Sequence, residues 1–364
     1  MKFVLAPDSF KESLTAKEVA DAMEVGIKKI FKDAECVKVP MADGGEGTVQ
    51  SLVDATDGKI YEVVVTGPLG NKVNAKYGIL GDGQTAVIEM AEASGIHYVK
   101  KEDRNPLITT TFGTGELIKS ALDKGVKKII IGIGGSATND GGAGMLQALG
   151  AKLLDKDNKE IPFGGGGLSD LVKINLDDFD KRIKEVEIEV ACDVSNTLTG
   201  KEGASAVFGP QKGATEEIIK ILDENLHHYA DIVNKTIGKD MENQKGSGAA
   251  GGLGFALLAF CDGKLNRGID IVIKYADLSE KMKGASYVIT GEGSIDSQTK
   301  FGKTPFGVSQ VAKQYDIPVI GIAGNVGEGI DELYDLGFDS ILSIMPGVMT
   351  LDKALSNAKE NIEN

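Results

Sequence analysis

The strongest constraint on the fold is an alternation of strand and helix patterns at both ends of the 364-residue chain. Residues 1–60 contain the strand pattern FVLAP, an amphipathic helix from Thr15 to Phe31, the strand pattern ECVKVP and a helix beginning near Glu46. Residues 286–364 repeat this rhythm: YVITG is followed by a helix through Val308 to Gln314, IPVIGIAG by a helix near Ile330, and SILSIMP by a terminal helix. This alternation predicts parallel βαβ units with right-handed crossovers.

The middle of the chain has a different pattern. The segments YEVVVTGPLG, NAKYGIL and TAVIEMA are short, closely spaced strands joined by Gly, Asn and Pro turns, as in antiparallel sheets. We therefore predict an α/β fold in which a second domain interrupts the first. The first is a flavodoxin-like or Rossmann-like parallel-sheet domain of residues 1–60 plus 286–364, and the second is an inserted α/β domain with antiparallel strands, residues 61–285.

Charge and cysteine content exclude several classes of partner. The formal net charge of −14 opposes binding to nucleic acid or to an anionic membrane surface. No apolar run approaches the ~18 residues of a membrane span, and no signal peptide is visible. The three cysteines are far apart and form no CxxC or zinc pattern, which favours a reduced, cytoplasmic setting. The oligomeric state stays open.

A glycine-dense segment, GIGGSATNDGGAG at residues 132–144, follows the buried-strand pattern KKIIIGIG and leads into the helical pattern GMLQALGA. Such a loop aims backbone N–H groups at a ligand, and a phosphate is the favoured occupant. Gly132, Gly134 and Ala137 also match the dinucleotide fingerprint G-x-G-x-x-G/A, with Asp155 about twenty residues further on. Against that interpretation, the loop continues with TNDGG before its helix and lies in the middle of the chain.

Short polar clusters beside glycine follow three of the predicted parallel strands. Ligands of open parallel sheets bind beyond the carboxyl ends of the strands, so these clusters are candidate site residues. The clusters are Asp8, Ser9 and Lys11 in PDSFK, Asp43, Glu46 and Thr48 in MADGGEGT, and Glu292 and Asp296 in GEGSID. Helix capping is the alternative for such residues, and Thr15 with Glu18 has the pattern of a capping box.

Carboxylates near a phosphate-binding loop suit magnesium, which takes oxygen ligands and bridges acids to nucleotide phosphates. Asp43, Glu46, Glu292 and Asp296 are the candidates, and the sequence leaves the choice among them open.

Two charged residues of the predicted insertion have more than one interpretation. Asp193 follows a strand in ACDVSN and is a helix cap, a metal ligand or the base of a phosphoryl transfer. Lys212 in VFGPQKGA is either a solvated surface lysine or a functional cation in a turn. The three histidines lie in no metal-binding or nucleophile-activating pattern, which disfavours zinc chemistry and hydrolase triads.

Taken together, these motifs resemble the type 1 glycerate kinase family. The resemblance covers nearly the whole chain in order, through these segments: APDSFKESLTA, PMADGGEGT, VVTGPLG, AVIEMAEASG, RNPLITTTFGTGEL, GIGGSATNDGGAGMLQALGA, ACDVSN, VFGPQKGA, GAAGGLGFALLAF and GEGSIDSQTKFGKTPFGV. Two residues depart from the family pattern, Glu12 where glycine is usual and Thr197 where proline is common.

The resemblance implies ATP-dependent phosphorylation of D-glycerate with Mg²⁺, with 2-phosphoglycerate favoured as the product. It also implies two α/β domains, with the second inserted into a flavodoxin-like first, and we expect transfer in a cleft between them. By position, the loop residues Gly134, Gly135, Ser136 and Thr138 are expected to bind nucleotide phosphates.

The remaining roles are expectations for the same reaction. We expect Lys11 and Asp193 to act in catalysis. We expect Asp8, Ser9 and Asp43 to bind the substrate, and Glu46, Glu292 and Asp296 to bind the metal. The alternatives are an NAD(P)-dependent hydroxy-acid oxidoreductase, suggested by the glycine fingerprint, and a non-catalytic sensor of phosphorylated acids.

Overall fold

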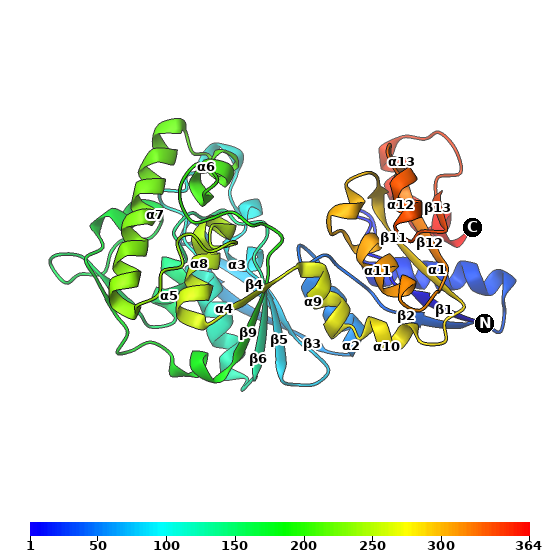
Figure 1. Ribbon diagram of the computed structural model, residues 1–364, viewed down its shortest axis with the longest axis horizontal. Helices are drawn as coiled ribbons and strands as arrows, with labels where there is room; N and C mark the ends of the chain where they lie inside the picture. Colours follow the sequence, from blue (N-terminus) through cyan, green and yellow to red (C-terminus); the bar gives the residue numbers. More distant parts are fainter. The chain divides into compact units, whose positions relative to one another are not determined.

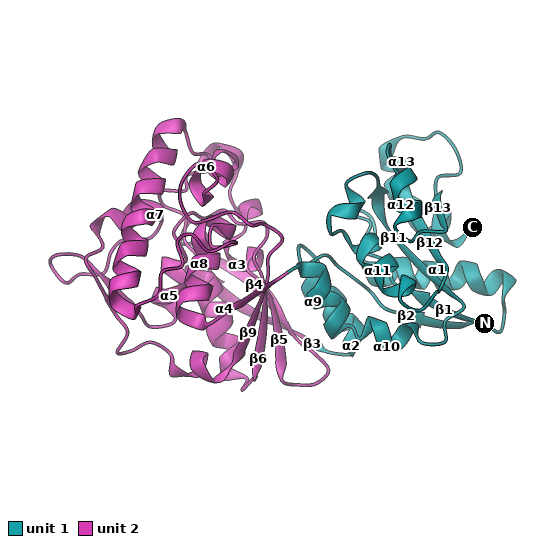
Figure 2. Ribbon diagram, in the orientation of Figure 1, with its two compact units in different colours: residues 1–58, 267–364 teal, residues 59–266 magenta.

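The chain forms two compact units, which Figure 2 colours separately. The computed structural model describes residues 1–364. Unit 1 comprises residues 1–58 and 267–364, and unit 2 is the insertion, residues 59–266. The chain returns to unit 1 at residue 267, earlier than the predicted 286. The physical reason is that α9 (Gly268–Tyr275) and α10 (Leu278–Met282) pack on each other and on α11 (Thr304–Lys313) of unit 1.

Unit 1 contains a five-stranded sheet in which every neighbouring pair is parallel. Its strands are β1 (Lys2–Leu5), β2 (Glu35–Lys38), β11 (Tyr287–Ile295), β12 (Val319–Val326) and β13 (Ser340–Ser343). The spatial order β2-β1-β11-β12-β13 is the flavodoxin-like order 2-1-3-4-5 when the strands are counted along the unit. The strand order therefore reverses between β1 and β11, where such folds bind their ligands.

The helices of unit 1 follow the strands as the sequence pattern predicts, with shifted ends. The capping box is confirmed, because Glu18 N donates to Thr15 Oγ1 and Thr15 N donates to Glu18 Oε2. The helix expected at Val308 begins at Thr304, since Pro305 suits the first helical turn. The other helices are α1 (Ala16–Ile30), α2 (Thr48–Thr56), α12 (Asp331–Asp335), α13 (Leu351–Ser356) and α14 (Ala358–Glu363). Helix α1 packs on the Phe3 and Leu5 side of the sheet, with Ile362 from α14.

Unit 2 contains a mixed six-stranded sheet in the order β10-β9-β6-β5-β4-β3. The predicted antiparallel strands are confirmed, because β3 pairs antiparallel with β4 and β4 with β5, whereas β5, β6, β9 and β10 are mutually parallel. The strands are β3 (Lys59–Thr66), β4 (Lys72–Ile79), β5 (Thr85–Glu89), β6 (Lys128–Gly132), β9 (Glu187–Ala191) and β10 (Lys264–Asn266). A separate hairpin-like pair is formed by β7 (Lys152–Leu154) and β8 (Lys173–Asn175).

The helices of unit 2 stack on one side of this sheet (Figure 1). They are α3 (Ala91–Ser94), α4 (Phe112–Asp123), α5 (Ala143–Ala148), α6 (Ala204–Phe208), α7 (Glu216–Ile237) and α8 (Ala249–Cys261). Ile129 and Ile131 of β6 are two residues apart and so lie on the same face of the sheet. They share a buried core with Leu117 of α4 and Phe255 of α8. This core holds β6 and the loop that follows it.

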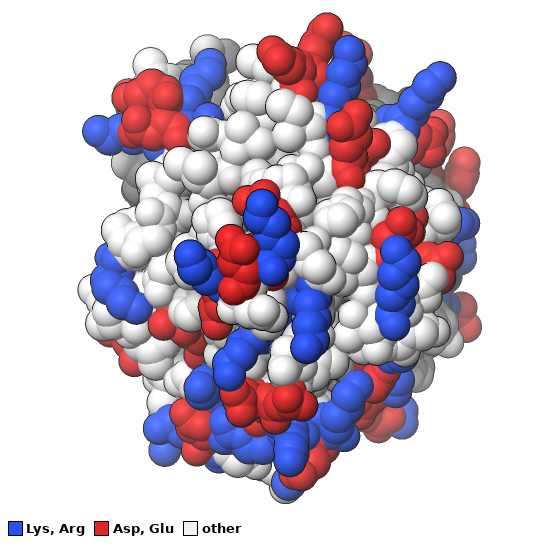
Figure 3. All heavy atoms as spheres, turned by 90° about the vertical axis from the view of Figure 1, so that its left-hand side faces the viewer, with Lys and Arg blue, Asp and Glu red and all other residues white.

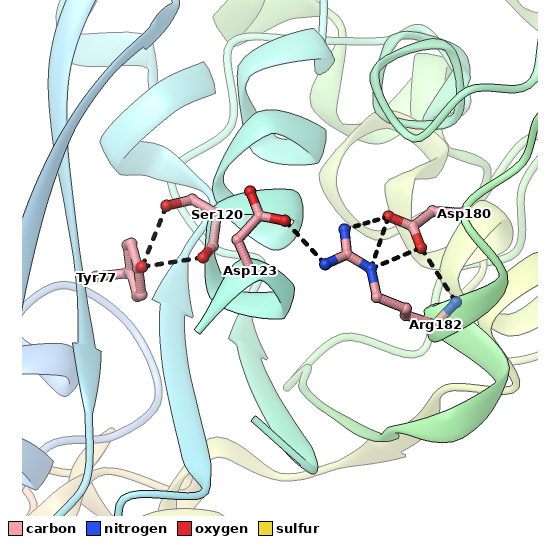
Figure 4. Close-up of polar contacts among 5 residues, drawn as sticks. All are labelled: Tyr77, Ser120, Asp123, Asp180 and Arg182. Atoms are coloured by element: carbon pink, nitrogen blue, oxygen red, sulfur yellow. Dashed lines mark hydrogen bonds and ion pairs between the residues drawn. The ribbon is translucent and has the colours of Figure 1, made fainter. Parts of the chain in front are cut away.

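In a polar network of unit 2 that lies away from the glycine-dense loop, the side chain of Arg182 is paired with two carboxylates (Figure 4). The Arg182 guanidinium donates to both carboxylate oxygens of Asp180 and to Asp123 at the end of α4, at 2.7 to 3.3 Å. Beside it, Tyr77 of β4 hydrogen-bonds Ser120 of α4. Every charge in this network has an opposite charge as its partner.

Positive and negative side chains are interspersed over the face that Figure 3 shows, and no large patch of one sign is visible on it. None of the helices is long and apolar enough to span a lipid bilayer.

Candidate functional site

Three acids, Asp8, Asp43 and Glu292, come together at the carboxyl ends of β1, β2 and β11, and we call them the acidic cluster. The Asp8 backbone N–H donates to Gly291 O at 2.8 Å, so the loop after β1 runs beside the strand that carries Glu292. Asp8 and Glu292 therefore flank the point where the strand order reverses.

Asp8 is buried and tightly held. Its carboxylate accepts hydrogen bonds from Ser9 N at 2.6 Å, from Ser9 Oγ at 3.2 Å and from Thr304 Oγ1 at the start of α11. Burial raises the pKa of Asp8 to about 6, and the nearby charge of Asp43 adds to the rise, although the bonds from Thr304 and Ser9 oppose it. The Ser9 side chain therefore fixes the rotamer of Asp8.

Glu292 has a still higher proton affinity. Burial raises its pKa to about 7, and the negative charges of Asp8 and Asp43 contribute. Lys303 opposes this rise with its ammonium 3.5 Å from Glu292 Oε1, where Thr299 also donates at 3.4 Å. Acids crowded in this way favour a cation or a proton between them.

The other residues predicted for this edge lie differently. Asp296 is linked to Glu292 through Lys303, whose Nζ lies 4.0 Å from Asp296 Oδ1. Glu46 is exposed in the turn before α2 and makes no side-chain hydrogen bond. No group of three or more His, Cys, Asp or Glu side chains is arranged to hold a metal by itself.

Lys11 is exposed in the turn after β1, and its ammonium makes no hydrogen bond or ion pair. It lines a cavity of about 320 Å³ within unit 1, together with Phe10, Asn325 and Met345. The next residue, Glu12, has a φ of 63°, in the left-handed region that favours glycine. That conformation gives a physical reason for glycine in the family pattern at this position.

In unit 2, residues 133–142 form the loop after β6, which we call the glycine loop. The backbone N–H groups of Gly134, Gly135 and Ser136 have no acceptor in the protein. Gly134 and Gly135 are exposed, and Gly135 has a φ of 73°. Consecutive N–H groups that are free in a loop of this kind make an anion-binding concavity.

The backbone N–H groups at the start of α5, which follows the glycine loop, have an acceptor within the protein. Asp140, which is fully buried, accepts hydrogen bonds from Gly142 N at 3.1 Å and Gly144 N at 3.2 Å at the start of α5. Thr111 N and Oγ1 also donate to Asp140, both at 2.8 Å. The donors at the start of α5 are thus used inside the protein, and the free donors lie near the end of β6.

The hydroxyl groups of the glycine loop are buried and bonded to one another. Ser136 Oγ lies 3.0 Å from Thr138 Oγ1 and accepts a hydrogen bond from Thr138 N at 3.0 Å. Thr138 is fully buried, so its side chain supports Ser136. Close packing continues behind the loop, where a Cβ added to Gly251 would lie 2.0 Å from Thr138 O.

Lys212 is a site residue that the sequence left undecided. It is only 2% exposed, and its Nζ donates to Thr138 O at 2.5 Å and to Ser136 Oγ at 3.2 Å. The signal in the sequence was a lysine in a Gly/Pro turn of an acidic chain.

Two acids lie at the same sheet edge as the glycine loop. Gly132 of β6 is paired with Ala191 of β9 and with Glu89 of β5, and Asp193 is the second residue after β9. Asp193 is exposed, whereas Glu89 is buried and was not considered from the sequence. Neighbouring parallel strands therefore bring these two acids and the glycine loop to one edge of the sheet.

The sequence and the structure both match known proteins along the whole chain. The sequence model described as "Glycerate kinase family" matches residues 3–364. The glycerate kinase of Bacillus subtilis (strain 168) is 57% identical over 363 residues, which cover 100% of this chain and 95% of that protein. The glycerate 2-kinase of Escherichia coli (strain K12) is 54% identical over 362 residues, with 100% and 95% covered. A crystal structure of a protein from Salmonella typhimurium LT2 superposes with a TM-score of 0.91 at 54% identity, and the match covers 100% of this chain and 95% of that one.

Proposed function

The chain belongs to the glycerate kinase family, and we propose that it transfers the γ-phosphoryl group of ATP to a hydroxyl of D-glycerate. The observation that carries this proposal is the match over residues 3–364 at 54 to 57% identity to relatives named glycerate kinase or glycerate 2-kinase. The backbone N–H donors of the glycine loop suit the phosphate oxygens of ATP, and the carboxylates of the acidic cluster suit a metal cation. Phosphoryl transfer needs both kinds of group.

We assign the nucleotide phosphates to the glycine loop. The unpaired N–H groups of Gly134, Gly135 and Ser136 support this assignment, because phosphate oxygens are strong acceptors. Thr138 contributes by holding the Ser136 hydroxyl in place through their 3.0 Å contact. Backbone donors of this kind are fixed before the substrate binds, so they need no reorganisation in the transition state.

In the transfer step, a hydroxyl oxygen of glycerate attacks the γ-phosphorus in line with the leaving oxygen. The new O–P bond forms as the bond to the β,γ-bridging oxygen breaks, and ADP leaves with that electron pair. Asp193 accepts the hydroxyl proton, which its exposed position at the same edge as the glycine loop supports. Lys11, whose ammonium is free of protein partners, neutralises charge on the phosphoryl group or on the glycerate carboxylate.

The acidic edge of unit 1 fits substrate hydroxyls and a hard cation. Asp8, held by Ser9, and Asp43 offer carboxylate oxygens to glycerate. The candidates for a magnesium ion are Glu292, Asp296 and Glu46. The first two lie on either side of Lys303, with their oxygens 3.5 and 4.0 Å from its Nζ, so this ammonium would have to move for one ion to bind both. When bound, the ion would neutralise charge on the phosphate oxygens.

We propose 2-phosphoglycerate as the product, by similarity to the relative named glycerate 2-kinase. The test is phosphorus NMR of a reaction containing ATP, Mg²⁺ and D-glycerate, recorded with coupling to protons. An ester at the central carbon gives a doublet, because one hydrogen is attached there, and an ester at the terminal carbon gives a triplet. A triplet would contradict the position of transfer, and no new ester signal would contradict the activity itself.

The oxidoreductase alternative is not supported, because the relatives are kinases. The local geometry agrees with them. In the dinucleotide fold the helix follows the fingerprint directly, whereas here α5 begins only at Ala143. Asp155 sits in a turn, where its Oδ1 accepts hydrogen bonds from Asp157 N and Lys159 N, and does not end a neighbouring parallel strand.

A cytoplasmic location is part of the same proposal. It is supported by the three cysteines, which form no disulfide bond.

A further inference from the structure

A buried lysine with no carboxylate partner contacts the glycine loop. Lys212 lies in the short turn Pro210–Lys212, and its Nζ contacts Thr138 O and Ser136 Oγ without forming an ion pair. The arginine of Figure 4 shows the usual arrangement in this unit, because Arg182 is half-buried and is paired with both Asp180 and Asp123. A buried lysine without a counter-ion is costly unless a ligand supplies the missing charge.

The number of acceptors around Nζ fits a neutral amine. A neutral amine has two hydrogens to donate, and the loop provides two acceptors for them, Thr138 O and Ser136 Oγ. The ammonium form has a third hydrogen, for which the protein offers no acceptor. An oxyanion on the neighbouring free N–H groups would supply both that acceptor and the negative charge.

The surroundings hold the lysine in this position. Lys212 N donates to Gly209 O at 2.9 Å, and Arg104 Nη1 donates to Gln211 O at 3.0 Å. The charged groups around it are this Arg104 and the buried Asp140. Asp140 cannot serve as a close partner, because its oxygens already accept hydrogen bonds from Thr111 and from the start of α5.

We propose that Lys212 and the N–H groups of Gly134, Gly135 and Ser136 form one oxyanion site, in which Lys212 takes up a proton when a phosphate or carboxylate binds. The inference rests on the proposed function for the identity of the ligand, but the proton uptake can be measured without any turnover. Lys212 is an anion-binding residue in this account. It holds Ser136 through the 3.2 Å hydrogen bond, and its ammonium completes the charge of the site when the anion is present.

The lowered pKa of Lys212 fits this arrangement. Burial lowers it to about 7, although Asp140 opposes the shift. A bound anion favours the ammonium and raises the pKa again. The affinity for the anion is therefore highest below pH about 7 and falls by up to about tenfold for each pH unit above it, until the pKa of the bound state is reached.

The experiment is calorimetric titration at pH 8 in two buffers with different ionisation enthalpies, which gives the number of protons bound with the ligand. A non-hydrolysable Mg-ATP analogue and D-glycerate are titrated separately, so that the anion that brings the proton is identified. With a pKa of about 7 in the free protein, wild type should take up about 0.9 more protons than Lys212→Met. Subtracting the proton number of Lys212→Met from that of wild type removes the protons that the nucleotide itself binds or releases.

Three variants complete the test. Lys212→Arg keeps a fixed charge and should bind with little dependence on pH. Lys212→Met should bind the analogue about 10-fold to 100-fold more weakly at pH 6.5, because a charged hydrogen bond is lost. Lys220→Met, an exposed lysine on α7, is the matched control and should behave as wild type. If Lys212→Met does not fold, Lys212→Arg alone decides, through its loss of proton uptake.

Equal proton uptake by wild type and both Lys212 variants, for both ligands, would overturn the inference. So would a fall in melting temperature for Lys212→Met with no change in the pH dependence of binding, since that is the result of a purely structural lysine. Proton-linked binding of the nucleotide analogue, together with no phosphorylated product in a separate reaction with Mg-ATP and D-glycerate, would instead reject the proposed function and leave this site standing.

Discussion

The acidic cluster of unit 1 and the glycine loop of unit 2 differ in the kind of group that has no partner: carboxylates in the first and hydrogen-bond donors in the second. In the acidic cluster, negative charges crowd one another, and burial raises the pKa of Asp8 to about 6 and that of Glu292 to about 7. In the glycine loop, backbone donors have no acceptor, and burial lowers the pKa of Lys212 to about 7. One region therefore lacks a cation and the other lacks an anion.

This difference teaches how a kinase site can be recognised from polar groups that the fold leaves unsatisfied. Folding alone favours charges that are paired, as those of Arg182 are, because a buried unpaired charge costs free energy. A Mg-nucleotide carries both of the missing charges, the cation and the phosphate oxygens. Substitutions in each region test whether these unsatisfied groups serve catalysis.

The largest effect is expected at the edge of unit 2. Asp193→Asn should lower kcat by about 10³, since the variant cannot accept the hydroxyl proton. Steady-state kinetics with ATP and D-glycerate measure this, and Asp157→Asn in an exposed turn is the control. Near-normal turnover of Asp193→Asn would mean that Asp193 is not the general base. The assignment of catalysis to this edge of unit 2 would then lose its support.

On the unit 1 side, Lys11→Ala should lower kcat by about 10², as expected when a donor to developing charge is removed. Its melting temperature should stay that of wild type, because Lys11 is exposed and makes no contact with another charge. Lys17→Ala, an exposed lysine on α1, is the control for both measurements. A melting temperature lowered as by a core substitution, with activity retained, would mean that Lys11 is structural.

Glu292→Gln should make the protein more stable and less active. The folded-state pKa of Glu292 is raised from 4.5 to about 7, so the carboxyl group costs stability as pH rises from 4.5 to about 7, and the cost is complete above that range. The variant lacks this cost and should be stabilised by about 3 kcal/mol at pH 8, with the gain vanishing near pH 4.5.

Thermal unfolding at a series of pH values measures that gain, and kinetics with varied Mg²⁺ measure the loss of activity. Glu46→Gln is the matched control for the unfolding measurement alone, because Glu46 is exposed beside the same edge and should leave the unfolding curve unchanged. A Glu292→Gln protein that is less stable at pH 8 would show that the bond to Lys303 outweighs the crowding of the acids.

The sequence predicted those features that depend on neighbours along the chain. The alternation of strand and helix in residues 1–60 and 286–364 gave the parallel sheet of unit 1, and the spacing of Thr15 and Glu18 gave the capping box. Asp8 after β1 and Glu292 near the carboxyl end of β11 could be named because parallel strands end at one edge.

Features that depend on distant segments could not be predicted. Lys212 is buried because Thr138 O, 74 residues earlier, accepts its hydrogen bond. The donors at the start of α5 are used by Asp140, whose place is fixed by Thr111, 29 residues away. A pattern of residue types shows which groups are present in a loop, but their mutual distances are set by tertiary packing.

The smallest effect is expected from a matched pair of glycine substitutions in the glycine loop. Gly135 has a φ of 73°, which is strained for any residue with a side chain, so Gly135→Ala should lower the free energy of unfolding by about 1 kcal/mol. It should also raise the KM for ATP about fivefold, because the free N–H groups turn away from the ligand. Gly134→Ala is the steric control, because an added Cβ would meet no atom within 4 Å and the melting temperature should not change. If Gly135→Ala lowers the melting temperature and leaves the KM for ATP unaltered, the loop conformation serves the fold alone, and the anion deficit of unit 2 has to be assigned to Lys212 without the N–H groups.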